Sequence, residues 1–470
     1  MNILANERAV APPGFNRWLI PPSVLAVHLC IGQVYALSVF SEPLTRIIGV
    51  AATSPEDWTP RSLAPLFVVA ISVLGLATTV GANWIERAGP RATMFLAACC
   101  FGGGFLVAAL GVFTHQLWLL YAGYGVFGGV GLGLGYLAPI ATMIKWFPDR
   151  RGAASGMAIM GFGGGAMIAT PLSKHLMDFF RTPTSVGITE TFIAMGVIYF
   201  ISMCLGALMI RVPPSGWRPE GIVHKDAAPA SIVAGSSTQH TVDVREAMKT
   251  PQFYLLWILL CMNVTGGIEL LARAPEMILN TFSGIMTPAA AAGFVGLLGL
   301  FNMSGRLIWS ASSDYIGRKE TYTVLLLLGA IFYAGIPYIG QTSVTLFVVL
   351  YVLVISIYGG CFAMIPAYIT DLFGSRDLTR IHGRLLSAWS VGVICSFLIN
   401  SLRVRQIGHG IPSSEVDAKI LYLAGVLLLI GFICNLLIRP VDSKHHTSEA
   451  PFRGATGTKV RARSMTEHGR

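Results

Sequence analysis

The sequence predicts an all-α membrane protein with twelve transmembrane helices in two six-helix bundles, and three observations lead to this fold class. Apolar residues make up 54% of the 470-residue chain and charged residues only 12%, whereas soluble domains average about 45–50% and about 25%. Mean hydropathy is +0.65. Apolar windows of about 20 residues, the length that crosses a bilayer as a helix, recur twelve times. Lipid is therefore the solvent for most of this chain.

The apolar windows must be helices, because hydrocarbon offers no partners for backbone N–H and C=O groups and each span has to satisfy them internally. The 52 glycines of the chain fit this interpretation, since small residues let membrane helices approach closely. In chain order, the predicted helices cover residues 18–40, 62–84, 92–113, 117–144, 152–176, 191–210, 253–272, 290–311, 321–339, 344–368, 383–401 and 420–438.

The longest polar gap divides the predicted helices into two sets of six. Its Pro, Gly, Ser and charged residues are typical of a linker. The first apolar run is too long to be the core of a signal peptide, so we expect it to remain as the first helix. The predicted organisation is an N-terminal tail at 1–17, a six-helix bundle at 18–210, a cytoplasmic linker at 211–252, a second six-helix bundle at 253–438 and a basic cytoplasmic tail at 439–470.

The formal net charge of +10 is spread unevenly over the predicted loops. With the N-terminus in the cytoplasm, 24 of the 33 Lys and Arg residues fall on the cytoplasmic side and eight on the outer side, which leaves Arg306 as the single base within a span. This bias follows the positive-inside rule and predicts that both termini are cytoplasmic. It also accounts for the net charge without a nucleic-acid partner. We expect a multi-pass protein of the bacterial inner (plasma) membrane.

Two loops at equivalent places in the two halves share one pattern. The loop after the second helix reads Glu86-Arg87-Ala88-Gly89-Pro90-Arg91, and the loop after the eighth reads Asp314-Tyr315-Ile316-Gly317-Arg318-Lys319, 228 residues further on. In each, an acid is followed after two residues by a glycine, which permits a tight turn, and then by basic positions. The repeat predicts two bundles related by an axis along the membrane normal. The expected gating residues are Glu86, Arg87, Gly89, Arg91, Asp314, Gly317, Arg318 and Lys319.

The paired loops, the six-plus-six layout and the linker resemble the major facilitator superfamily. More narrowly, the sequence is similar to the oxalate/formate antiporter branch in Ile31-Gly32-Gln33-Val34-Tyr35, Lys145-Trp146-Phe147-Pro148-Asp149-Arg150-Arg151-Gly152 and Ile381-His382-Gly383-Arg384. The resemblance implies the major facilitator fold and exchange of small carboxylates, in a branch that neighbours the monocarboxylate transporters. The first loop departs from the family pattern, with Glu86 for Asp and Pro90 for a base, which we expect to alter gating and not the fold.

Arg306 is the principal candidate for substrate binding. It precedes Asp314 by eight residues, so it lies about 12 Å inside the end of its helix. A charge at such depth costs about 2.5–3.5 kcal/mol even on the lenient insertion scale. A guanidinium also matches a carboxylate with two parallel hydrogen bonds. The alternative is a structural ion pair with Glu269 of the seventh helix. The resemblance implies a base in the eighth helix that grips the substrate carboxylate, and Arg306 falls there.

The resemblance also implies a second base in the eleventh helix for carriers of dicarboxylates. The middle of that helix, Leu386-Ser387-Ala388-Trp389-Ser390-Val391, contains no Lys or Arg, and we interpret Arg384 as a loop charge. One buried cation balances one carboxylate better than two. The sequence therefore favours a monocarboxylate such as formate, lactate or pyruvate over oxalate.

Polar and aromatic side chains are expected to complete the pocket. The resemblance implies that the first, fourth, seventh and tenth helices line the cavity, which directs attention to Tyr35, Gln33, Tyr136 and Tyr358, with Trp389 from the eleventh helix. A tyrosine hydroxyl can donate to a carboxylate while its ring excludes water. The alternative for these side chains is packing or a place at the membrane interface.

Coupling to protons is the main functional alternative. His28 is the only histidine predicted deep in a span, and it is a candidate proton carrier or a neutral residue bonded to a backbone carbonyl. No Asp or Glu is predicted at the centre of a span, where proton-coupled pumps usually carry one. This favours exchange of one anion for another over proton-coupled uptake of a carboxylate or another small polar solute.

The sequence gives no sign of a cofactor, a metal site or an enzyme. Gly161-Phe162-Gly163-Gly164-Gly165 lacks the Lys-Ser/Thr of a phosphate-binding loop, so ATP-driven transport is not expected. The eight cysteines lie in apolar runs without metal-ligand spacing, which indicates packing. We therefore expect a monomeric carrier whose partners are a small carboxylate and the lipid bilayer.

Overall fold

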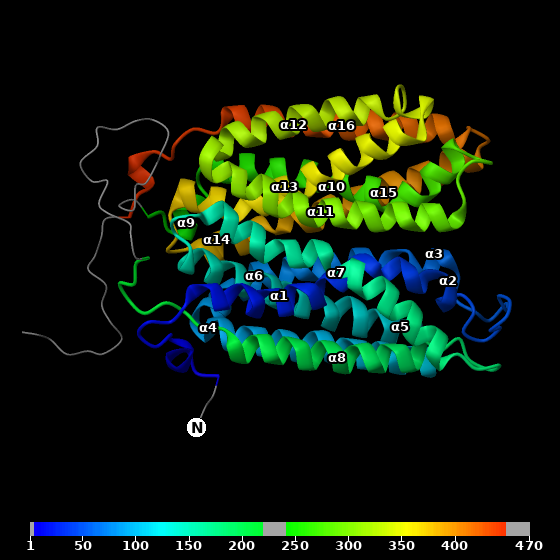
Figure 1. Cartoon of the computed structure of the whole chain (residues 1–470), viewed down its shortest axis with the longest axis horizontal. Coiled ribbons are helices and arrows are strands. Elements are labelled where there is room, and N and C mark those ends of the chain that lie inside the picture. The colour runs from blue at the N-terminus through cyan, green and yellow to red at the C-terminus, as the bar shows by residue number, and fades with distance from the viewer. Residues whose placement is uncertain (1–3, 220–240, 448–470) are drawn as a thin grey trace, which may run out of the picture.

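The computed structural model describes residues 4–219 and 241–447. Long helices run side by side along the long axis of the molecule, in two groups that lie one above the other (Figure 1). The first half of the chain forms the lower group in this view and the second half forms the upper group. Parts of the predicted linker and of the predicted basic tail lie outside the described residues, and the five-part division of the chain stays a prediction.

The first half contains helices of three kinds, because η3 is a nine-residue 3₁₀ helix and η4 is a seven-residue π-helix. In order, this half forms η1 (Asn6–Ala9), η2 (Arg17–Leu19), α1 (Ile20–Ile31), η3 (Gly32–Phe40), α2 (Ser41–Leu44), α3 (Pro60–Leu63), α4 (Pro65–Phe113), α5 (Leu117–Leu120), η4 (Tyr121–Phe127), α6 (Gly128–Trp146), α7 (Arg151–Phe180) and α8 (Ile188–Met209).

In the second half, threonines cap two of the long helices. Thr250 and Thr287 accept hydrogen bonds from backbone N–H groups in the first turns of α10 and α11, where these groups have no partner within the helix. This half forms α9 (Val244–Ala247), α10 (Pro251–Thr281), α11 (Pro288–Ile316), α12 (Arg318–Gly335), η5 (Gly340–Thr342), α13 (Val344–Phe373), α14 (Leu378–Leu385), α15 (Ser387–Gly408), α16 (Ser413–Leu437) and η6 (Ser443–His445).

In the described part of the chain, ten helical spans are long and apolar enough to cross a membrane. One of them, Pro60–Phe113, comprises two membrane helices, because Gly89 within it has φ 80° and ψ 169° and ends the first. α12 is not among the ten, because Arg318, Lys319 and Glu320 crowd its first turn. Counting Pro60–Phe113 as two helices and adding α12 gives the twelve membrane helices that hydropathy predicts.

The glycines of the two repeated loops adopt backbone conformations that favour glycine. Gly89 has a φ of 80° and Gly317 a φ of 104°, in the region where a side chain would clash with the backbone. Each ends one membrane helix and allows the next to start at once. The tight turns expected from the repeat are therefore present.

Two helices extend beyond their predicted ends. α10 continues nine residues past the predicted limit at 272, to Thr281, and α14 and α15 together cover Leu378–Gly408 where 383–401 is predicted. The added turns carry Arg273 and Arg403, which are both buried. A hydropathy window counts these charges as loop residues, because it cannot detect that partners inside the bundle neutralise them.

The junction of α1 and η3 approaches α7 so closely that the backbones touch at Gly32, the first residue of η3, and at Gly165 of α7. A Cβ added to Gly165 would lie 2.6 Å from the Cα of Gly32, and one added to Gly32 would lie 2.9 Å from the Cα of Gly165 and would also overlap the carbonyl oxygen of Phe162. Neighbouring backbone cannot move aside as a flexible side chain can. This contact therefore fixes α1, and with it the start of η3, against α7.

Gly32→Ala is expected to destabilise the protein by about 1–3 kcal/mol, the usual cost of overpacking a well-packed interior. The measurement is the thermal unfolding midpoint of purified protein in detergent. Gly103→Ala is the matched control, because nothing lies within 4 Å of the Cβ that it adds to α4. Equal midpoints for the two variants would show that α1 and α7 are not in close contact.

Candidate functional site

Arg306 belongs to α11 of the second half, and its side chain lies against Gly163 of α7 in the first half. The two helices are neighbours at the boundary between the groups (Figure 1). The Arg306 side chain is fully buried. Its Nε donates a hydrogen bond to Oδ1 of Asn302 at 3.0 Å, and its guanidinium carbon lies 5.8 Å and 5.2 Å from the ring centres of Phe162 and Phe362. Among the described residues, neither terminal amino group of Arg306 has a hydrogen-bond partner. Buried donors are rarely left in this state, so the arrangement suits an anionic acceptor.

Glu269, the acid that the sequence offered as a partner for Arg306, is engaged elsewhere. Its Oε1 lies 2.8 Å from Nε of Arg273, and its Oε2 accepts a hydrogen bond from Ser396 at 2.8 Å. The alternative that Arg306 is neutralised by Glu269 is therefore wrong. The cause is the extension of α10, which supplies Glu269 with an arginine one turn later in the same helix.

Tyr136 and Trp389 join Arg306 around the same two phenylalanine rings. The ring centre of Trp389 lies 5.3 Å from Phe162, 4.7 Å from Phe362 and 5.7 Å from Tyr136. Tyr136 and Trp389 are fully buried. Within the described residues, the Tyr136 hydroxyl and the Trp389 Nε1 lack hydrogen-bond partners. The structure thus collects four donor groups that have no partner among the described residues, two of them on the Arg306 guanidinium, beside the rings of Phe162 and Phe362.

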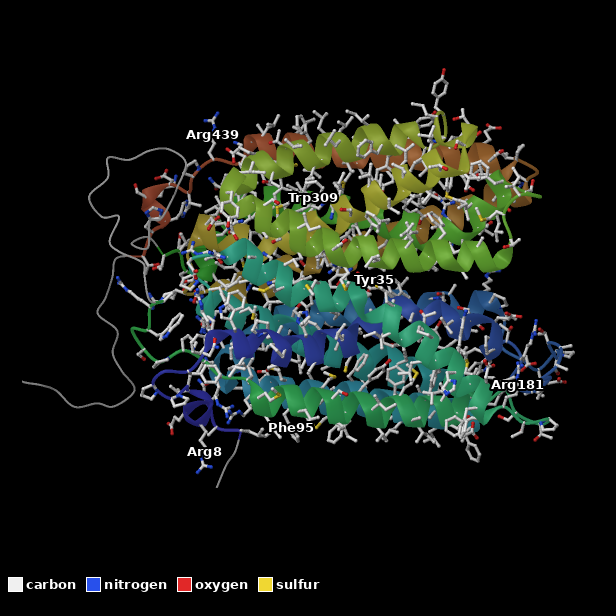
Figure 2. The ribbon with its side chains drawn as sticks, viewed as in Figure 1. Arg8, Tyr35, Phe95, Arg181, Trp309 and Arg439 are labelled. Carbon is white, nitrogen blue, oxygen red and sulfur yellow. The ribbon has the colours of Figure 1, made fainter. Side chains whose placement is uncertain are left out.

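Tyr35 and Tyr358 connect the two halves beside this enclosure. Their hydroxyl oxygens lie 3.4 Å apart, and the ring of Tyr35 meets the ring of Phe162 edge-on at 5.3 Å. Figure 2 shows Tyr35 at the boundary between the two groups of helices. Tyr358 is buried, whereas Tyr35 is only half-buried. The pair therefore separates the buried aromatic rings from a more accessible region.

Gln33 and His28 contact tyrosines of the first half, Tyr124 and Tyr136. The Gln33 Oε1 accepts a hydrogen bond from the Tyr124 hydroxyl at 3.1 Å, and its Nε2 has no partner among the described residues. The His28 ring stacks on Tyr136 at 5.5 Å, and its Nε2 lies 3.3 Å from the Tyr136 carbonyl oxygen. His28 therefore supports Tyr136 through the backbone bond that the sequence offered as its alternative role.

His382 is a second buried histidine, so the prediction that His28 is the only one deep in a span is wrong. Its ring lies 5.9 Å from Tyr136 on the opposite side of the contact between the halves. The error arises because the predicted eleventh helix starts at 383, whereas α14 begins at Leu378. Arg384 also belongs to α14 and donates to the carbonyl oxygen of Arg380, so it is a helix residue and not a loop charge.

Asp314 joins the two halves at one end of the molecule. Its two carboxylate oxygens accept hydrogen bonds from the backbone N–H groups of Gly152 and Ala153, each at 2.8 Å, in the first turn of α7. Helix N-termini carry a partial positive charge that favours this contact. Arg318 lies 2.5 Å from Asp314 and 3.0 Å from Asp371. This network closes what we call the termini end, which carries η1 and η6 (left in Figure 1).

Glu86 makes the corresponding contact from the other repeated loop. Its carboxylate lies 2.7 Å from Nε of Arg380 in α14, and Arg380 also pairs with Asp377 at 3.0 Å. Glu86 therefore meets a side chain of the facing helix, whereas Asp314 meets a helix N-terminus. The two loops are equivalent in position but not in chemistry.

The remaining basic residues of the loops hold single halves together or face solvent. Arg91 is buried and donates to the carbonyl oxygen of Ile210 at the end of α8. Lys319 donates to two backbone carbonyl groups at the end of α16, at 2.7 and 2.9 Å. Arg87 is exposed. Among the residues proposed for gating, side-chain contacts between the halves thus involve Glu86, Asp314 and, through Asp314, Arg318.

A buried charge cluster in the second half overturns two predictions. Arg273 and Arg403 both approach Oδ1 of Asp417, at 2.5 and 2.6 Å, and Arg403 also pairs with Glu276 at 2.9 Å. Arg306 is therefore not the single intramembrane base. Glu269, which pairs with Arg273, is a buried acid near the middle of α10, so the prediction that no acid lies at the centre of a span is also wrong.

The sequence did not identify Phe162, Phe362 or Asn302 as site residues. Phe162 and Phe362 are bulky residues within runs of small ones, a pattern that also occurs in ordinary helix packing. Asn302 lies one helical turn before Arg306, on the same face of α11. Of these three residues, Asn302 is the one for which the sequence contains a signal, namely this spacing from Arg306.

The family model of the Major Facilitator Superfamily matches residues 24–396 of this chain. The oxalate:formate antiporter of Oxalobacter formigenes is 26% identical over 374 residues, which cover 78% of this chain and 80% of the antiporter. Apicoplast pyruvate carrier 1 of Toxoplasma gondii is 23% identical, across 92% of this chain and 91% of the carrier.

The solved structure of the proton:xylose symporter XylE bound to 6-bromo-6-deoxy-D-glucose superimposes with a TM-score of 0.64 and 13% sequence identity, over 91% of this chain and 95% of that one. At this identity the likeness concerns the fold alone. The predicted fold class is confirmed by the family match and by this likeness. The chain belongs to the Major Facilitator Superfamily, and it is a multi-pass, all-helical membrane transporter and not an enzyme.

Proposed function

We propose that this transporter exchanges small monocarboxylates, such as formate, lactate or pyruvate, by alternating access, with oxalate as a further candidate. The observation that carries the proposal is the buried guanidinium of Arg306, whose two terminal amino groups have no partner among the described residues. Keeping such a charge in a membrane helix is costly. A carboxylate cargo supplies the missing countercharge and two acceptor oxygens in the geometry that a guanidinium prefers.

The roles of the site residues follow from their chemistry. Arg306 binds the carboxylate, and the Tyr136 hydroxyl and the Trp389 indole N–H donate to it or to a further oxygen of the substrate. Tyr35 and Tyr358 cover the site, and Gln33 shapes it through Tyr124. Arg273 and Arg403 are already paired, so within the part of the chain that the structure describes Arg306 is the one cation of the enclosure without a countercharge, which suits one carboxylate.

Transport then proceeds by rocking of the two halves about this site. The Asp314 and Glu86 contacts close the termini end and separate when it opens. An empty site leaves the Arg306 charge without a partner, so passage through the closed state is unfavourable unless an anion is bound. This predicts obligatory exchange. The names of the two relatives, an oxalate:formate antiporter and a pyruvate carrier, lend support to a carboxylate substrate.

Counterflow in proteoliposomes tests the proposal. Vesicles loaded with unlabelled formate, lactate or pyruvate are expected to accumulate the same labelled anion from outside, because each exchanged anion restores the pairing of Arg306. Oxalate and succinate are expected to exchange at least roughly tenfold more slowly, because a second buried carboxylate would have no cation to balance it. Exchange of neutral solutes without any exchange of carboxylates would reject the proposal.

Proton-coupled uptake is a second candidate, because His28 and His382 lie against Tyr136 from the two halves. It predicts that an inward proton gradient drives labelled lactate into vesicles that contain no anion, and that His28→Ala abolishes this uptake. Exchange alone predicts no such uptake.

We also propose that the termini end faces the cytoplasm of a bacterial cell. The excess of Lys and Arg in the loops at this end supports this orientation. Reporter fusions after Met209 and after Leu437 test this orientation. A reporter that works only outside the cytoplasm should be inactive at both positions, and its activity there would reverse the assignment.

A further inference from the structure

The contact between Arg306 and Asn302 defines how the guanidinium is oriented. Asn302 lies one turn before Arg306 in α11, and its side chain is 2% exposed. Its Oδ1 takes the Nε–H of Arg306 at 3.0 Å. The guanidinium has five N–H donors in a fixed fork, and Nε–H is the one on the side nearest the chain. The bond to Asn302 therefore consumes that donor and leaves the four donors of the terminal amino groups.

Two glycines leave the space that this pair of side chains occupies. A Cβ on Gly163 of α7 would lie 2.6 Å from Nε and 2.9 Å from Cδ of Arg306. A Cβ on Gly359 of α13 would lie 2.7 Å from Oδ1 of Asn302. The side chains of Arg306 and Asn302 thus fill spaces that only glycine leaves open, one on each side. Neither can move far without meeting backbone.

The acceptor in this contact is neutral. An amide oxygen accepts the Nε–H and leaves the positive charge of Arg306 uncompensated. An aspartate in its place would neutralise that charge before any substrate arrived, and a side chain without an acceptor would leave Nε–H unpaired and the guanidinium free to rotate. Asparagine therefore holds the Arg306 guanidinium in place without neutralising its positive charge.

A guanidinium binds a carboxylate in two ways, either through both terminal amino groups or sideways through Nε and one amino group. We propose that Asn302 is a positioning residue that blocks the sideways mode, so that Arg306 takes its anion only through the two terminal amino groups. Substrates must then present a carboxylate along the axis of the guanidinium, towards Tyr136 and Trp389. This inference rests on the proposed function, because it describes how the proposed substrate is held.

A pH test of this proposal must take into account the titratable groups that lie around Arg306. His28 of α1, Tyr136 of α6 and Tyr358 of α13 interact electrostatically with Arg306, whereas α7 presents Gly163 and Phe162. No ion pair between Arg306 and an acid occurs among the described residues, since Glu269 pairs with Arg273. An aspartate at position 302 would add a carboxyl group beside Arg306, where the described residues place none.

The experiment compares wild type, Asn302→Asp and Asn302→Ala by counterflow of labelled formate, lactate and pyruvate between pH 5.5 and 7.5. Asn302→Asp is expected to raise KM at least roughly tenfold at pH 7.5. Its KM should then fall by up to about tenfold per pH unit as the pH is lowered, because the new carboxyl must take up one proton before the anion can bind. Asn302→Ala is expected to raise KM several-fold at every pH, with little change in the maximal rate.

A merely structural role for Asn302 predicts a lower maximal rate in both variants with no pH-dependent KM. Asn302→Ala preserves the test if Asn302→Asp fails to fold, since an unchanged KM for this neutral variant overturns the proposal. The two levels of inference are separable. Wild type that exchanges none of the carboxylates overturns the proposed function itself, whereas wild type that exchanges them alongside variants with its own KM and pH profile overturns only the role of Asn302.

Discussion

Arg306→Gln is expected to abolish carboxylate exchange while leaving a folded protein. Glutamine keeps a polar side chain with N–H donors, although it is shorter than arginine, and it removes the charge and with it the reason for an anion to enter the enclosure. Loss of one partner of a buried, hydrogen-bonded charge pair typically costs about 2–5 kcal/mol, which corresponds to a loss of roughly 30-fold or more in apparent affinity. The measurement is counterflow of labelled lactate into proteoliposomes that contain equal amounts of each protein.

The matched control is Arg405→Gln, which makes the same substitution at an exposed arginine of α15. It should exchange lactate at the wild-type rate. Arg306→Lys separates charge from geometry, because an ammonium group retains the charge but cannot offer two parallel hydrogen bonds. We expect it to restore only part of the activity. Wild-type counterflow by Arg306→Gln would remove Arg306 from the site and leave the family membership untouched.

The fold could be predicted from the sequence because its main cause is a one-dimensional signal. A helix such as α13 must be long and apolar to cross lipid, and Val344–Phe373 is apolar along most of its 30 residues. The break at Gly89 was predictable for a similar reason, since the repeated loop places a glycine where the turn requires one. The helix ends were less predictable, because Arg273 and Arg403 count as loop residues in any window that ignores their partners.

The candidate site could be predicted in part. Arg306 was identifiable because an isolated charge in an apolar helix is costly and therefore informative. Phe162 and Phe362 were not, because an aromatic residue in a membrane helix carries no mark of what its ring faces. The sequence also could not show that Arg306 is not paired with Glu269, because this depends on the three-dimensional arrangement of the helices. Two acids and several arginines in neighbouring helices allow many pairings, and only the helix rotation selects among them.

The charge cluster of Glu269, Arg273, Arg403 and Asp417 is expected to be the most sensitive point for stability. Asp417 is buried, and its Oδ1 lies 2.5 Å from Arg273 and 2.6 Å from Arg403. It therefore ties α10 and α15 to α16. Asp417→Asn removes the carboxylate that both guanidinium groups share, and it leaves Arg403 with Glu276 alone, whose side chain is half exposed. Breaking a buried ion pair by removing one partner costs about 3–5 kcal/mol, since it leaves a buried charge uncompensated.

Thermal unfolding of purified Asp417→Asn in detergent measures this cost, and Glu415→Gln in the same helix is the control. Glu415 pairs with Lys419 at 2.7 Å, but both side chains are more than half exposed, and such a surface pair is worth only about 0.3–0.5 kcal/mol. The midpoint of Asp417→Asn should therefore fall clearly below that of Glu415→Gln. Equal midpoints would mean that Glu269 and Glu276 are enough to balance Arg273 and Arg403 when Asp417 is neutral. In that case Asp417 would not be the residue on which the stability of the cluster depends.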